Sequence, residues 1–122
     1  MTPIFICYST CTTCRKAKKW LEERGVEFTE RPIKEQNPTA EELRSWQRLS
    51  GLPLRKFFNT SGLLYRQMEL TKKLPNMTEE EMLSLLSSDG MLVKRPLLIL
   101  DNAVLVGFRE ETWANALPVP RA

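Results

Sequence analysis

The chain has 122 residues, of which 42% are hydrophobic and 27% charged, and these proportions are ordinary for one soluble globular domain spanning 1–122. Its net charge of +3 falls short of the dense basic stripe of a nucleic-acid-binding protein, and no apolar stretch is long enough to cross a membrane. The absence of histidine excludes histidine metal sites, histidine general bases and every Ser-His-Asp triad. Because no basic leader precedes the first apolar run, we expect a cytoplasmic protein. We also expect it to be a monomer.

A strand, a helix and a second strand are predicted first. Pro3–Tyr8 contain a short apolar run that is typical of a buried strand. The apolar positions over 12–24 lie on one face of a helix, and Gly25 suits its C-terminal cap. Alternation over Val26–Arg31 predicts a second strand, which Pro32 limits. Together these elements predict a βαβ unit with parallel strands and a right-handed crossover.

The middle of the chain, about 39–90, is predicted to be a helical insertion. Thr39 and Glu42 form a capping-box pattern at the start of a helix that ends at Gly51. Three residues are expected on its apolar face: Leu43, Trp46 and Leu49. Gly51 suits a helix cap, and a contact with a partner protein is the alternative.

Shorter helical segments are predicted to follow within the insertion. The segment 54–58 indicates a short helix that a turn over 59–62 stops, and 67–73 adds another turn or two. Thr78 and Glu81 repeat the capping-box pattern for a helix that the Asp89-Gly90 pair closes. The insertion is therefore expected to be helical to its end.

Two strands and a helix are predicted at the C-terminal end. Leu97–Leu100 give the strongest strand signal, Asp101-Asn102 suit a tight turn, and 103–106 complete a hairpin. A last helix over 110–117 places Trp113 and Leu117 on one face. The order β-α-β, helical block, β-β-α predicts an α/β thioredoxin-like fold with a mixed sheet of about four strands.

Cys11 and Cys14 form a Cys-X-X-Cys pair between the first strand and the first helix. Backbone N–H groups at a helix start and the helix dipole stabilise a thiolate there, so Cys11 is the expected nucleophile. Cys14, one turn later and on the inner face, is the expected resolving thiol. Two alternatives stay open, half of a zinc site and two inert buried thiols, although this chain lacks the four ligands that zinc normally needs.

Two further features of the sequence bear on the cysteine pair. Cys7 lies within the apolar run of the first strand and is expected in the core. Lys94-Arg95-Pro96 precede the strand at 97–100. In thioredoxin-like folds a proline at this point is typically cis and packs beside the active cysteines, which would bring Arg95 close to Cys11. An ordinary strand-edge proline beside a solvated arginine is the alternative.

Three stretches of the sequence resemble the arsenate reductase-related family, which includes ArsC, the YffB-type proteins and the Spx regulators. They are Tyr8-Ser9-Thr10-Cys11-Thr12-Thr13-Cys14-Arg15-Lys16-Ala17, Lys94-Arg95-Pro96-Leu97-Leu98-Ile99 and Val106-Gly107-Phe108. The resemblance implies Cys11, Cys14 and Arg95 as catalytic residues. It implies four substrate-binding residues: Thr12, Thr13, Arg15 and Pro96.

The resemblance also bears on the substrate. Arsenate reductases of this family hold the oxyanion with three arginines, and only Arg95 clearly matches one of them. Asn59 and Phe108 occupy the other two expected positions, with Arg109 one place away. Loss of two charged contacts, each about 1.5–3 kcal/mol, makes arsenate reduction doubtful.

The Cys-X-X-Cys form is more similar to the Spx side, whose members form a disulfide under oxidative stress and bind the C-terminal domain of the RNA polymerase α subunit. Gly51 could occupy the place of a glycine in that contact. Three hypotheses follow: a thiol oxidoreductase, an Spx-like regulator, and a zinc or structural module. The first implies glutathione, thioredoxin or glutaredoxin as electron donor, without a bound cofactor.

Overall fold

A mixed β-sheet of four strands forms the centre of the computed structural model, which describes residues 2–117. The strand order is β2-β1-β3-β4; β1 and β2 are parallel, and the other two pairs are antiparallel. The strands are β1 (Ile4–Cys7), β2 (Thr29–Pro32), β3 (Leu97–Ile99) and β4 (Val104–Val106). This topology confirms the predicted thioredoxin-like fold. Residues 1 and 118–122 of the expected domain lie outside the description.

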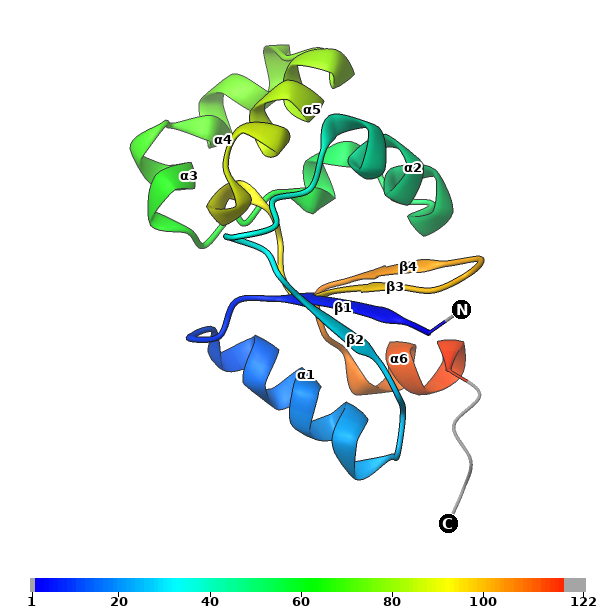
Figure 1. The fold of residues 1–122 in the computed structure, drawn as a ribbon. Coiled ribbons are helices and arrows are strands. Elements are labelled where there is room, and N and C mark those ends of the chain that lie inside the picture. Colours follow the sequence, from blue (N-terminus) through cyan, green and yellow to red (C-terminus); the bar gives the residue numbers. More distant parts are fainter. Residues whose placement is uncertain (1, 118–122) are drawn as a thin grey trace.

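Helices cover both faces of the sheet (Figure 1). α1 (Thr12–Glu23) and α6 (Glu110–Ala116) lie on one face, and the helical block between β2 and β3 lies on the other. The block comprises α2 (Ala40–Ser50), η1 (Leu54–Phe57), α3 (Leu63–Gln67), α4 (Leu70–Lys73), η2 (Leu74–Asn76), α5 (Glu79–Ser88) and η3 (Gly90–Leu92). None of the helices between residues 2 and 117 combines the length and the apolar character that crossing a membrane requires.

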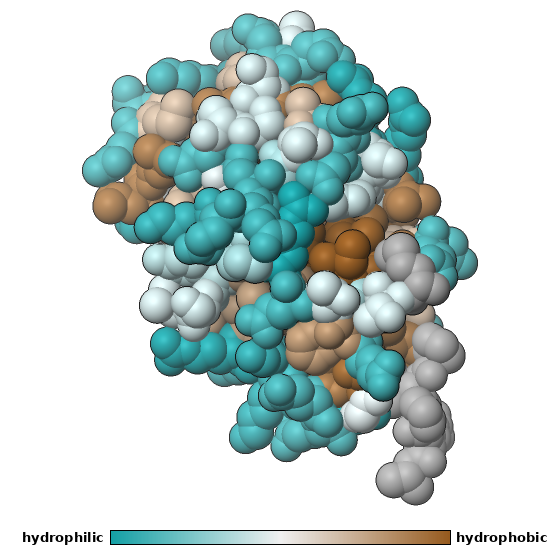
Figure 2. Space-filling model, viewed as in Figure 1, coloured by the Kyte–Doolittle hydropathy of each residue, from teal (hydrophilic) through white to brown (hydrophobic). Residues whose placement is uncertain are grey.

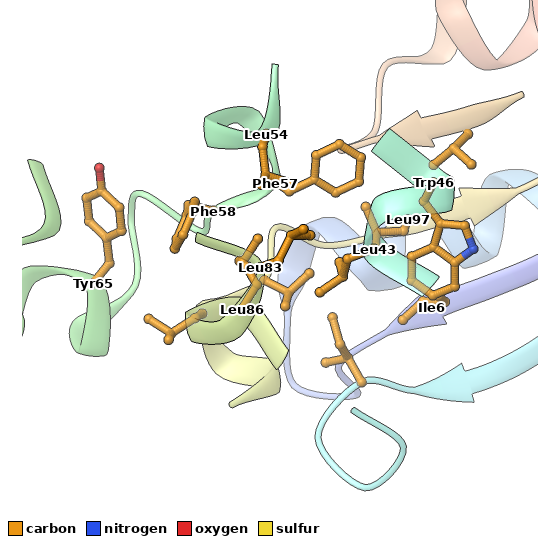
Figure 3. Packing of buried hydrophobic residues seen from close by; sticks show 14 of the residues in the cluster. Ile6, Leu43, Trp46, Leu54, Phe57, Phe58, Tyr65, Leu83, Leu86 and Leu97 are labelled. Carbon is orange, nitrogen blue, oxygen red and sulfur yellow. The ribbon is translucent and has the colours of Figure 1, made fainter. Parts of the chain in front are cut away.

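Alternate residues of β1 supply two separate cores, because successive side chains of a strand point to opposite faces of the sheet. Ile6 packs with Leu43 and Trp46 of the helical block, as Figure 3 shows. Phe5 and Cys7 pack on the other face, in the cluster that holds Trp113 of α6. The first strand therefore contributes side chains to both cores, one below the helical block and one below α1 and α6.

The ends of α1 follow from local chemistry. Cys11 is the N-cap residue, with extended backbone (φ −78°, ψ 123°), and its N–H donates to the Tyr8 carbonyl at 3.0 Å. Gly25 has φ +68° and, as predicted, ends the helix: its N–H donates to the Glu22 carbonyl, and that of Val26 donates to the Leu21 carbonyl. These two hydrogen bonds form a Schellman motif. The Cys-X-X-Cys pair thus lies at the first turn of α1.

Both predicted capping boxes are present. Thr39 and Glu42 bond reciprocally at the start of α2, and Thr78 and Glu81 do so at the start of α5. Gly51 has φ +70° and caps α2, as its sequence position indicated.

The second strand and the insertion differ in detail from the sequence expectation. β2 begins at Thr29 rather than at Val26, because Thr29 pairs with Ile4, where β1 itself begins. α3 was not anticipated from the sequence. It is separated from α4 by Glu69, whose left-handed backbone (φ +53°) interrupts what would otherwise be one helix.

The face of α2 also differs from expectation. Leu43 and Trp46 are buried, but Leu49 is 42% exposed. Leu52 and Leu63 are also exposed, to 36% and 67%. Figure 2 shows mainly hydrophilic residues on one face of the molecule, with apolar residues in small separate patches. That face therefore carries no single broad apolar surface (Figure 2).

Candidate thiol site

Cys11 is half-buried at the N-terminal end of α1. Partial burial raises the pKa of its thiol. This effect is outweighed by hydrogen bonds from the backbone and side chain of Cys14, by the Thr13 backbone N–H and by the positive charge of Arg95, so that the pKa lies below its ordinary value. Cys11 is thus the thiol best prepared for nucleophilic attack.

Cys14 has the opposite character. Its side chain is 3% exposed, and its sulfur accepts a hydrogen bond from the Tyr8 N–H at 3.3 Å. Burial raises the pKa of its thiol to about 12, and the neighbouring Cys11 adds to that increase. Cys14 is therefore protonated at neutral pH, inside the protein and beside Cys11. This arrangement suits a thiol that acts after Cys11 has reacted.

Arg95 lies next to the pair. The Arg95–Pro96 peptide bond is cis, as predicted, and the guanidinium carbon lies 5.0 Å from the centre of the Tyr8 ring. The Nε and Nη1 atoms of Arg95 are buried without a hydrogen-bond partner. Arg95 also lines the space beside Cys11, so its positive charge acts on the thiol.

A cleft of about 810 Å³ opens in front of Cys11 and Arg95. Its walls come from Thr13 on α1, from η1 and the turn at 59–62, and from the segments that flank β3 and β4. Of the residues that the structure describes, no carboxylate lines it and five cationic side chains do: Arg55, Lys56, Lys94, Arg95 and Arg109. We call this space the basic cleft. Its electrostatic field favours an anionic ligand next to the reactive thiol.

Backbone hydrogen bonds join two walls of the basic cleft that come from distant parts of the sequence. The Lys94 N–H donates to the Phe57 carbonyl at 2.7 Å, and the Asn59 N–H donates to the Leu92 carbonyl at 2.8 Å. A β-bridge between Phe58 and Val93 lies between these bonds. As a result, the end of η1 is fixed beside the segment that carries Arg95.

The predicted substrate-binding residues divide into two groups. Thr13 lines the basic cleft, together with Cys11 and Arg95, whereas Thr12, Arg15 and Pro96 do not. Arg15 bends toward the loop before α1, where its Nε donates to the Ser9 carbonyl at 3.1 Å. Pro96 is buried, and its carbonyl accepts the Gly107 N–H. Arg15 therefore lies outside the lining of the basic cleft, and its role in substrate binding stays a prediction.

Arg55 and Lys56 belong to none of the sequence motifs that predicted the site. A signal for them exists in the pattern Leu54-Arg55-Lys56-Phe57, in which the two outer residues are buried and the two cations are exposed. Asn59, where an arginine was expected, and Arg109 also line the basic cleft. The local pattern indicates that Arg55 and Lys56 are exposed, but the packing of η1 against 92–94 places them in the same cleft as Cys11.

Cys7 lies in the core, as predicted, on the other side of the pair. It is 5% exposed, and its thiol donates to a Glu30 carboxylate oxygen at 3.6 Å. Burial, assisted by Glu30, raises the pKa of Cys7 to about 12. Among the described residues no cluster of three or more cysteine and carboxylate side chains is arranged to hold a metal ion.

The thioredoxin-like sheet, the Cys-X-X-Cys pair at the start of α1 and the adjacent cis-proline together define a thiol-redox protein. The chain belongs to the ArsC family, whose model matches residues 7–116.

Named relatives agree with this placement. The chain is 54% identical over 118 residues to YusI of Bacillus subtilis (strain 168), covering 93% of this chain and 100% of that protein. It is 32% identical over 104 residues to the regulatory protein MgsR of the same organism, covering 85% and 81%. A crystal structure of an ArsC family related protein from Bacteroides fragilis superposes with a TM-score of 0.92 at 54% identity, covering 94% and 97%. The family resemblance of the sequence is therefore confirmed.

Proposed function

We propose that this protein carries out thiol–disulfide exchange, with Cys11 as the nucleophile and Cys14 as the resolving thiol. The supporting observation is the contrast within the pair. The Cys11 pKa is lowered at the mouth of the basic cleft, whereas the Cys14 pKa is raised in the interior. Exchange needs one thiolate that meets the partner and one protected thiol that reacts second.

The exchange balances as follows. The Cys11 thiolate attacks one sulfur of the partner disulfide, a mixed disulfide forms, and the other partner sulfur leaves as a thiolate. Cys14 loses its proton and attacks the Cys11 sulfur, which closes the Cys11–Cys14 disulfide and releases the second partner thiol. The partner gains two electrons, and the cysteine pair loses two. We propose glutathione, thioredoxin or glutaredoxin as the donor that restores the pair.

Arg95 stabilises the attacking thiolate in this proposal, through its positive charge beside Cys11. Thr13 contributes a backbone N–H at the same place. Arsenate is not proposed as the main substrate, because Asn59 and Phe108 line the cleft where the family resemblance expects arginines.

The experiment that tests the proposal follows mixed disulfides by mass spectrometry. The Cys14→Ser variant is expected to accumulate a mixed disulfide between Cys11 and a disulfide substrate, since the resolving step is missing. The Cys11→Ser variant is expected to form none, and Cys7→Ala is the control for loss of a thiol outside the pair. Unchanged behaviour of both pair variants would contradict the proposal.

A redox-sensing regulator is the second candidate, with the RNA polymerase α subunit as its partner. It is favoured by Leu49 and Leu52, which are 42% and 36% exposed on either side of Gly51. The test is binding of the isolated α C-terminal domain to the reduced and the oxidised protein. Binding that strengthens on oxidation and is lost in Leu49→Ser would support the regulator; no binding in either state would refute it. The exposed Leu63→Ser serves as the matched control.

A further inference from the structure

A second hollow, of about 470 Å³, adjoins the basic cleft. The two spaces share three wall residues, Arg55, Lys56 and Thr60, so the cations of η1 form the ridge between them. Beyond the ridge the walls are mainly apolar, formed by Tyr65, Leu74, Pro75, Met77 and Met82. We call this second space the methionine pocket.

Charge separates this surface from the rest of the molecule. The chain carries 18 lysines and arginines and 15 carboxylate residues, yet within residues 2–117 no carboxylate side chain lines either hollow. Four cations outside the two hollows form ion pairs with carboxylates, as in the Arg31–Glu42 and Arg44–Glu80 pairs, both 2.7 Å apart. The cations of the ridge and the basic cleft are therefore arranged for an anionic group from another molecule.

The shape of the surface calls for an extended ligand. The reactive sulfur of Cys11 lies at the wall of one hollow, and the apolar side chains lie in the next, with Arg55 and Lys56 between them. A polypeptide presents a disulfide sulfur, carboxylates and an apolar side chain at successive positions along one strand. Methionine side chains adapt to varied apolar groups, so Met77 and Met82 suit a pocket for such an anchor.

Resting on the proposed thiol exchange, we infer that the partner disulfide belongs to an acidic polypeptide segment, whose carboxylates contact the Arg55–Lys56 ridge and whose apolar side chain enters the methionine pocket. Cys11 attacks the segment's disulfide sulfur, the distal sulfur leaves as a thiolate, and Cys14 then releases the segment as a thiol while the pair becomes oxidised. The cleft thus selects an acidic protein segment instead of a small disulfide.

The test compares short peptides that carry one cysteine in disulfide linkage to the same thionitrobenzoate leaving group. One peptide has acidic residues and a leucine, a second replaces the acidic residues with lysines, and a third replaces the leucine with serine. The second-order rate constant for release of the leaving group is expected to be about tenfold or more higher for the acidic peptide than for the basic one, with the difference shrinking as salt rises. Replacing the leucine should lower the rate.

A matched pair of variants locates the selection. Lys56→Glu is expected to reduce the acidic-to-basic rate ratio several-fold, whereas Lys34→Glu keeps it, because exposed Lys34 lines neither hollow. The two variants have the same net charge. Since each ratio is measured within one variant, differences in the intrinsic reactivity of Cys11 cancel.

The outcomes separate the inference from the proposed function. No reaction with neutral 2-hydroxyethyl disulfide would refute the thiol exchange itself. Reaction with that reagent, together with equal rates for acidic and basic peptides, would refute only the acidic segment. Glutathione linked to the same leaving group is compared with an acidic peptide of equal net charge. Equal rates for those two, or for the leucine and serine peptides, would overturn the polypeptide ligand.

Discussion

The three cysteines lie in two different environments around the first turn of α1. On one side, Cys11 meets the basic cleft, whose charged walls are all cationic. On the other, Cys7 and Cys14 line a small hollow of about 130 Å³ with Glu30 and Lys18, which form an ion pair at 3.0 Å. The thiol pKa is lowered on the first side and raised on the second. Burial, hydrogen bonds to the sulfur and nearby charge therefore decide which cysteine is reactive, because the residue type is the same.

The largest expected effect is the difference in exchange rate between a variant that lacks the Cys11 thiol and one that lacks the Cys7 thiol. Cys11→Ser should lower the rate of disulfide exchange by more than about 10³-fold, since the nucleophile is lost. Cys7→Ala should keep the wild-type rate and reduce stability by about 1 kcal/mol through a small cavity. Exchange kinetics and urea unfolding of both variants check this. Equal losses of activity in the two variants would contradict the proposed difference in reactivity between Cys11 and Cys7.

Alkylation of the native, reduced protein should rank the three thiols. Cys11 should react with iodoacetamide first, because it is half-exposed and its pKa is lowered. Cys7 and Cys14, with pKa values of about 12, are almost wholly protonated at pH 8 and are buried. At that pH, only about one such thiol in ten thousand is ionised. Peptide mapping after timed quenching measures the order, with urea-unfolded protein as the reference in which all three react alike.

Arg95→Gln should shift the pH dependence of Cys11 alkylation upward. The rate rises as the thiolate forms, so its midpoint reports the Cys11 pKa, which the Arg95 charge helps to lower. Arg95→Lys, which keeps the charge, should shift the midpoint less. By linkage, the lowered pKa stabilises the fold above the pKa of the unfolded thiol, and this contribution is lost as pH falls through the native pKa. A midpoint that does not move in Arg95→Gln would remove Arg95 from the thiolate site.

The smallest effect is expected at Glu30. Glu30→Gln removes a negative charge and changes the hydrogen bond at Cys7, so the Cys7 pKa should fall. Burial is the larger cause of the raised pKa, and Cys7 should therefore stay much less reactive than Cys11. Stability should change by less than about 1 kcal/mol, because the Lys18–Glu30 pair is exposed, each side chain to 42%. Cys7 alkylation at the Cys11 rate in this variant would show that charge outweighs burial.

Much of the local structure follows from neighbouring residues alone. The capping boxes at Thr39 and Thr78 and the left-handed caps at Gly25 and Gly51 could be predicted, because each depends on a few consecutive residues. The N-terminal position of Cys11 on α1 follows in the same way, since a strand, a turn and an amphipathic run fix where the helix begins. The element order then predicts the fold.

Long-range packing decided the rest of the site. Arg15 has the right place in the motif, but it bonds to the Ser9 carbonyl and does not line the basic cleft. Arg55 and Lys56, about forty residues from Cys11 in the chain, reach the cleft because η1 pairs with the segment before Pro96. The chemistry of the cysteine pair is thus encoded locally, in the start of one helix. The charge around it depends on backbone bonds between distant segments, which no short sequence pattern contains.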